Sequence, residues 1–182
     1  MDEASAAGSA SERLVQDEWF GSVRVTLPDE DSAVVRVEGP GVPTATLVRT
    51  GEVRDHPQAP VGTRDAARLT MTVGGDTAGL HLGAGRLTRS SFSVSAELPG
   101  RAYVLEPTSA FGGVLRRNGH QVAAFVNAED ELSAAWRPES ACPSAEDAAV
   151  GYLLAAAFGT GAAHTGELVF EALLGAIGLP VR

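Results

Sequence analysis

The feature that most constrains the fold is a run of sixteen uncharged, mostly apolar residues, 148–163, in an otherwise acidic chain. Ser144 and Asp147 precede the run with the spacing of a capping box, which predicts a helix that begins at this serine. Apolar residues occur on every side of the helix, so none of its faces suits water. A membrane span needs about 20 apolar residues. This run is shorter, so we expect a helix over 144–160 that is buried all round.

The residues before position 138 alternate between apolar and polar side chains, which is typical of half-buried strands. The Asn118-Gly119 pair predicts a tight hairpin turn, because both residues tolerate positive φ angles. We expect nine or ten strands, a long loop over 54–65 and no helix in this part of the chain. The expected strands lie at 22–27, 33–39, 44–50, 68–73, 80–82, 91–98, 101–107, in two arms of 112–126, and at 132–136.

With no companion helix available, the apolar helix must be wrapped by the strands. The fold class is therefore expected to be mainly β: an antiparallel β-barrel, closed or nearly closed, that encloses a hydrophobic helix near the C-terminus. The small residues in "LLAAAF" suit the limited room inside a small barrel. We expect this barrel domain to span residues 19–164, after a small, polar, acidic tail over 1–18 that we expect to be disordered.

The last segment, 165–182, predicts one further helix. Thr165 is a candidate N-cap, and Gly178 and Pro180 punctuate the end, so the helix is expected over 166–177. Its surface is too apolar to leave in water. It either packs on its own barrel, which we favour, or contacts a partner. The candidate partner contacts are Leu168, Phe170, Leu173 and Leu174.

Composition excludes several classes of function. The formal net charge of −9 opposes nucleic-acid binding, and all fourteen basic residues are Arg. The absence of Lys rules out Schiff-base chemistry and a P-loop. The first residues carry acids where a secretory signal carries cations, so we expect a cytoplasmic protein without a transmembrane span. Cys142, the only cysteine, is expected to be a buried and inert thiol.

The sequence contains one candidate functional site, a group of arginines. The four histidines lack metal-ligand spacing and no catalytic set emerges, so we expect no metal, no cofactor and no enzyme activity. Residues 86–117, in contrast, hold five arginines against only Glu97 and Glu106. They either form a face that binds an anionic lipid head group or an acidic partner, or are ordinary solvated charges. These arginines are Arg86, Arg89, Arg101, Arg116 and Arg117.

The stretch "GRAYVLEPTSAFGGVLRRNGHQVAAF" resembles the bacterial members of the tubby-like and LURP-one-related (phospholipid-scramblase-like) superfamily. The resemblance covers residues 22–160 loosely and 100–158 better. It implies a twelve-stranded barrel around a hydrophobic helix. Because tubby proteins bind phosphoinositides, the resemblance also implies an anion-binding surface. The segment 165–182 departs from the family, whose chains often stop soon after the central helix.

These observations favour a non-enzymatic binding or scaffolding module of the tubby and LURP-one type. Such a module would contact an anionic ligand or a protein partner through its arginine-bearing face, or associate with itself. One alternative is an assembly subunit that docks through its C-terminal apolar helix. A small enzyme is the second alternative.

Overall fold

The computed structural model describes residues 11–28, 33–51, 56, 59–85, 88–128 and 131–159. Its strands form one sheet in which each strand pairs antiparallel with the next along the chain, in the order β1 to β11. The strands are β1 (Glu12–Asp17), β2 (Gly21–Thr26), β3 (Val34–Gly39), β4 (Val42–Arg49), β5 (Leu69–Val73), β6 (Asp76–Leu82), β7 (Val94–Leu98), β8 (Arg101–Pro107), β9 (Gly112–Arg117), β10 (His120–Ala128) and β11 (Glu131–Trp136).

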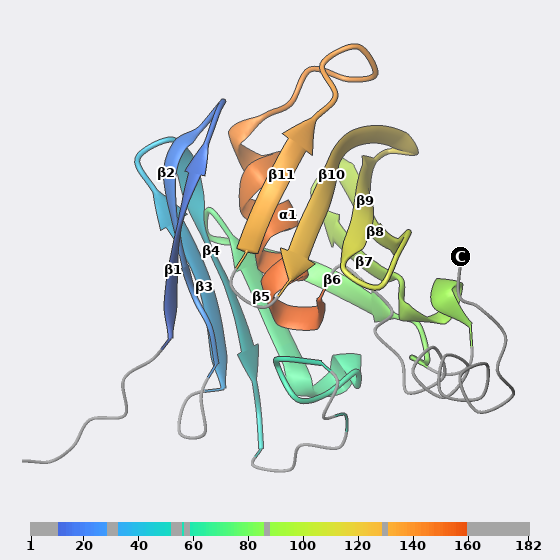
Figure 1. The fold of residues 1–182 in the computed structure, drawn as a ribbon. Coiled ribbons are helices and arrows are strands. Elements are labelled where there is room, and N and C mark those ends of the chain that lie inside the picture. Colours follow the sequence, from blue (N-terminus) through green and yellow to red (C-terminus); the bar gives the residue numbers. More distant parts are fainter. Residues whose placement is uncertain are drawn as a thin grey trace, which may run out of the picture.

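The sheet curls into a nearly closed barrel around a single helix of the described part, α1 (Ala145–Phe158) (Figure 1). Strands β2 to β5 and β8 to β10 all contact this helix. Every helix residue from Ala148 to Phe158 is buried, so the helix has no solvent face. The predicted fold class, an antiparallel barrel that encloses an apolar helix, is confirmed.

The start of α1 is also confirmed. The Ser144 hydroxyl accepts a hydrogen bond from the Asp147 backbone N–H at 3.3 Å. The Asp147 carboxylate in turn accepts from the Ser144 N–H at 2.7 Å, which completes the capping box. The helix ends at Phe158, and Gly159 follows with a φ of 74°, a conformation that favours glycine.

Most strands lie where alternation predicted them, with differences at their ends. Asn118 and Gly119 both have positive φ angles, 50° and 83°, as the hairpin prediction required. The predicted strand 91–98 is shorter, because Arg89–Phe92 forms a 3₁₀ turn and β7 begins at Val94. A second 3₁₀ turn, Ala66–Arg68, leads into β5.

The predicted disordered tail is wrong for residues 12–17, which form β1. Val15 and Asp17 are buried in this strand, whereas Leu14 points outward and is 64% exposed. Only one inward side chain is thus an ordinary core residue, which is why the apolar pattern did not reveal a strand. The strand is stabilised mainly by its ladder with β2 and by the hydrogen bonds of the buried Asp17 carboxylate. Residues 1–10 of the predicted tail lie outside the described residues.

The described part of the predicted loop 54–65 covers the C-terminal end of α1. The Val61 N–H donates to the Ala157 carbonyl at 2.9 Å, and both Val61 and Thr63 are buried. The Arg64 guanidinium lies 5.6 Å from the centroid of the Phe158 ring. Burial lowers the pKa of Arg64 to about 10. The guanidinium still remains charged at neutral pH, beside the helix end where a positive charge is favourable.

Gly151 leaves the room that the Phe125 ring occupies against the helix. A Cβ at this position would overlap the ring of Phe125 and crowd Leu115. Gly151→Ala is therefore expected to lower the free energy of unfolding by about 1–3 kcal/mol, although the same change in an open helix raises it by about 1 kcal/mol. Urea unfolding measures the change. In a Phe125→Leu background, where the ring is absent, the penalty should shrink; an equal penalty there would contradict the account.

The predicted helix 166–177, with Leu168, Phe170, Leu173 and Leu174, lies outside the described residues. No helix in the described part is long and apolar enough to cross a membrane.

Candidate functional site

The barrel has a seam between its first and last strands. Eleven antiparallel strands in chain order leave β1 and β11 as the two edges, and because their number is odd, these edges run in the same direction (Figure 1). The two strands lie close to each other. In the described part, however, no ladder pairs these two strands. The ring thus stops one ladder short of closure.

Asp17 connects the two edges and the helix at one end of this seam. Its carboxylate accepts hydrogen bonds from Tyr152 Oη at 2.6 Å and from Trp136 Nε1 at 2.9 Å. It also accepts from the backbone N–H groups of Trp19 and Phe20, at 2.8 and 3.0 Å, in the turn after β1. Burial, followed by the hydrogen bond to Asp17, raises the pKa of Tyr152. The tyrosine therefore stays a neutral donor at physiological pH.

Arg13 and Asn127 make the corresponding link at the other end. Arg13 Nη1 donates to Asn127 Oδ1 at 2.8 Å. Asn127 lies opposite Leu132 in the pairing of β10 with β11, and its Nδ2 donates to the Ala155 carbonyl of α1 at 2.8 Å. Side chains therefore link β1 to β11 at one end, through Asp17 and Trp136, and to β10 at the other, through Arg13 and Asn127. With Asn127 opposite Leu132, both links agree with a parallel register in which Arg13 lies beside Leu132 and Asp17 beside Trp136.

The hydrogen bonds beside β11 show which of its main-chain groups face the seam. The Asn127 N–H donates to Phe111 O, on the β9 side, and the Arg137 N–H donates to Val122 O of β10. Hydrogen-bonding direction alternates along a strand. Glu131, Ser133 and Ala135 therefore bond to β10, and the backbone groups of three other residues of β11 face the seam. These are Leu132, Ala134 and Trp136.

The backbone of β1 alternates in the same way. Its predecessor Ser11 accepts from the Leu27 N–H, so Arg13, Val15 and Asp17 direct their backbone groups toward β2. The groups that face the seam belong to Glu12, Leu14 and Gln16. Side chains of these three residues point outward, whereas those of the seam-facing residues of β11 point inward.

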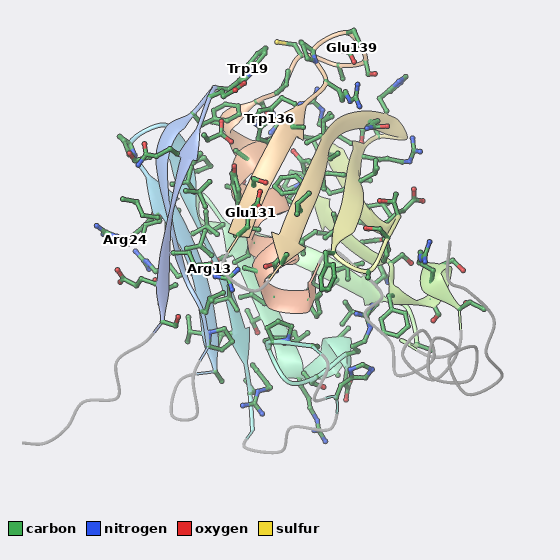
Figure 2. All side chains as sticks on the ribbon, viewed as in Figure 1. Arg13, Trp19, Arg24, Glu131, Trp136 and Glu139 are labelled. Carbon is green, nitrogen blue, oxygen red and sulfur yellow. The ribbon has the colours of Figure 1, made fainter. Side chains whose placement is uncertain are left out.

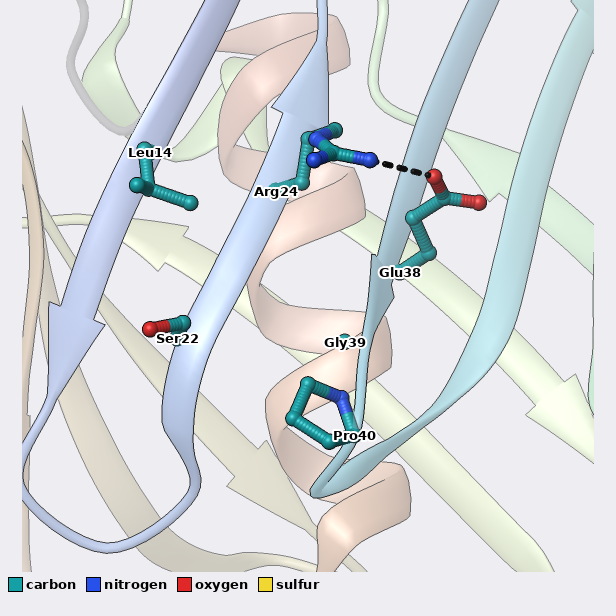
Figure 3. A pocket seen from close by; sticks show the side chains of 6 residues that line it. All are labelled: Leu14, Ser22, Arg24, Glu38, Gly39 and Pro40. Atoms are coloured by element: carbon teal, nitrogen blue, oxygen red, sulfur yellow. Dashed lines mark hydrogen bonds and ion pairs between the residues drawn. The ribbon is translucent and has the colours of Figure 1, made fainter.

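The outer surface beside the seam is partly apolar. Leu14 is 64% exposed on β1, and Trp19 is 48% exposed in the turn that follows (Figure 2). A hollow of about 240 Å³ lies next to Leu14 on the outside of β1, β2 and β3, with Pro40 at one side and the Arg24–Glu38 ion pair, 3.3 Å long, at the other (Figure 3). Its remaining lining residues are Ser22 and Gly39.

The predicted arginine face is placed differently from the seam, and its described members all have contacts within the protein. Arg101 forms an ion pair with Glu146 at 2.5 Å and Arg117 one with Asp147 at 2.6 Å, both at the start of α1. The structure thus brings these two arginines together around the helix N-terminus. Arg116 pairs with Glu106 at 2.9 Å, and Arg89 donates to the Thr108 carbonyl. Arg86 lies outside the described residues.

Tyr103 completes the cluster at the helix N-terminus. Its hydroxyl lies 2.8 Å from Glu146 Oε1 and 3.0 Å from Asp147 Oδ1, so one phenolic proton serves two carboxylates. Burial, followed by the charge of Asp147, raises the pKa of Tyr103. The phenol therefore stays neutral and holds both acids beside the positive end of the helix dipole. These contacts favour a structural role for Arg101 and Arg117.

The described histidines and the cysteine lie on different parts of the fold. His81 lies on β6 and His120 at the start of β10, and His164 is outside the described residues. Over the ranges that the structure describes, no three His, Cys, Asp or Glu side chains are placed to hold a metal ion. Cys142 is exposed, so its predicted burial is wrong. It lies in the β11–α1 connection, where its carbonyl accepts from Arg117 at 3.1 Å.

Sequence reasoning missed the residues of the seam: Asp17, Arg13, Asn127 and Tyr152. One signal was present, because Arg13, Val15 and Asp17 alternate with outward residues just before the turn that leads into β2. Two of these three are charged, however, and their partners lie more than 110 residues away, at sequence separations of 114 and 135. Nothing local indicates such pairings.

Comparison with protein-family models, with curated proteins and with solved structures found no match. The resemblance to the tubby-like and LURP-one-related superfamily stays a prediction.

Proposed function

We propose that this chain is a non-enzymatic binding module that takes up an extended segment of a protein partner at the seam between β1 and β11. One observation carries the proposal: in the described part, β1 and β11 are each paired with a neighbouring strand on one side only, so the main-chain groups along the seam belong to no ladder. An edge strand of this kind is a template for an added strand, whose backbone supplies the affinity. We do not place the binding surface on the predicted arginine face, because two of its members, Arg101 and Arg117, pair with Glu146 and Asp147.

Two adjacent alanines of β11 give a matched test. The Ala134 N–H faces the seam, whereas the Ala135 N–H belongs to the ladder with β10. Proline removes an N–H and is tolerated where that group has no partner. We expect Ala134→Pro to fold with little change in melting temperature and to weaken the binding of an extended peptide by about tenfold or more. Ala135→Pro should lower the free energy of unfolding by about 1–3 kcal/mol, with peptide binding retained by the folded fraction.

The probes are fluorescein-labelled eight-residue peptides in which Val alternates with Thr, Arg or Glu, and fluorescence anisotropy measures their binding. A peptide with N-methyl groups on alternate amides serves as the control, because it cannot form the ladder. If no peptide of the set binds the wild-type protein, or if Ala134→Pro binds as well as wild type, the proposed function is wrong.

A further inference from the structure

Resting on the proposed function, we infer that the seam accepts one strand that runs antiparallel to both β1 and β11. Its inward residues are apolar, and it carries a basic residue on its outer face between Glu12 and Glu131. The orientation of the added strand follows from the directions of β1 and β11, and its basic residue follows from the glutamates on these two strands.

The orientation follows from the direction of the two edges. Because β1 and β11 run the same way, a single strand between them is either antiparallel to both or parallel to both. Every other ladder of the described barrel is antiparallel, and antiparallel ladders are slightly more stable per residue than parallel ones. An antiparallel strand would therefore continue the pattern of the sheet without exception.

The alternation of the seam-facing groups along β1 and β11 permits such a strand to bond on both sides. In antiparallel pairing, directly opposite residues that exchange hydrogen bonds have side chains on the same face. Inward residues of the added strand would then bond to inward residues of β11, such as Ala134, whose groups face the seam. Its outward residues would bond to outward residues of β1, such as Leu14. The residues that bond to β11 and the residues that bond to β1 therefore alternate along the added strand, so one strand can bond to both edges.

The charge preference follows from the register of the seam. The register inferred from the links Arg13–Asn127 and Asp17–Trp136 aligns Arg13 with Leu132, and hence Glu12 with Glu131, at one end of the seam. Figure 2 shows Arg13 and Glu131 near this end, with Trp136 farther along β11. Both glutamates point outward and are exposed. Like charges at facing positions of a sheet are destabilising, and opposite charges are favourable. An Arg or Lys side chain between the two carboxylates would be favourable to both.

The inner face of the seam is suited to apolar side chains of moderate size. Between the two polar links lie Val15, which is buried, and Ala134, which is half-buried and small. The partner strand would direct its inward side chains past these residues toward the apolar helix.

Entry of a strand requires the edges to separate. Neighbouring strands are about 4.8 Å apart, so an inserted strand holds its two neighbours about twice that distance apart. The Trp136–Asp17 hydrogen bond crosses the seam and must break, whereas the Tyr152–Asp17 bond can remain, because it joins β1 to the helix. A variant that has already lost the crossing bond should bind more tightly.

The first experiment compares peptides with Arg or Glu at the polar positions, on the wild-type chain. The Arg peptide is expected to bind about fivefold or more tightly than the Glu peptide, and this difference should shrink in 1 M salt. Glu131→Gln together with Glu12→Gln should remove most of it. Equal binding of both peptides, with Ala134→Pro still weakening each, would refute the charge preference and leave the proposed function standing.

The second experiment measures orientation and opening. A spin label at either end of the Arg peptide, read by paramagnetic broadening of nearby amides, should place the peptide N-terminus beside Trp136 and the C-terminus beside Glu131. The reverse placement would refute the antiparallel strand.

Trp136→Phe keeps an aromatic ring against Phe20 and Phe125 but loses the bond to Asp17, and it should tighten binding severalfold. Trp19→Phe, in which only an exposed ring changes, is the control and should bind like wild type.

Discussion

Leu154→Asp is expected to leave no folded population at 25 °C. Leu154 is fully buried in α1, in the middle of the barrel. A carboxylate at this position would have no partner, and the free energy of burying it exceeds the total stability of 5–15 kcal/mol that is typical of a domain. Far-ultraviolet circular dichroism and urea unfolding would show the loss.

The matched control is Leu154→Met, which keeps volume and polarity and should cost less than about 1.5 kcal/mol. A Leu154→Asp protein that is monomeric and unfolds cooperatively would contradict the enclosure of the helix by the strands.

Asp147→Ala is expected to lower the free energy of unfolding by about 3–5 kcal/mol, the usual cost of removing one partner of a buried ion pair. Asp147 is fully buried, and its carboxylate contacts Arg117 at 2.6 Å, the Ser144 N–H at 2.7 Å and the Tyr103 hydroxyl at 3.0 Å. The change leaves a guanidinium, an amide and a phenol without this acceptor.

Ser144→Ala separates capping from the ion pair, because it removes only the hydroxyl of the capping box and should cost about 1 kcal/mol. Urea unfolding of the two variants gives the comparison. Equal losses in both variants would mean that the pair between Asp147 and Arg117 contributes nothing beyond the cap.

Much of the fold could be predicted because it depends on local patterns. Alternation identified ten of the strands, the Asn118-Gly119 pair identified a hairpin, and the capping box at Ser144 fixed the start of the helix. Apolarity on all sides of residues 148–158 required a surrounding sheet. Each of these features depends on residues that lie within a few positions of one another in the sequence.

The seam could not be predicted in the same way. Its existence depends on whether the number of strands is odd or even, and that number changed when residues 12–17 proved to be a strand. Its links join Arg13 to Asn127 and Asp17 to Tyr152, residues brought together only by the closing of the barrel. The arginine face was predicted from the local charge balance of residues 86–117, which does not reveal that Glu146 and Asp147 would lie beside two of its arginines.

Residue-resolved amide hydrogen exchange on the free protein tests the open seam most directly. Along β11, we predict fast exchange at Leu132, Ala134 and Trp136 and slow exchange at Ser133 and Ala135, which bond to β10. Along β1, Leu14 and Gln16 should exchange faster than Val15. If the amides that face the seam are instead as well protected as their neighbours, β1 and β11 are already paired in the free protein, and the claim that the barrel accepts a partner strand is wrong.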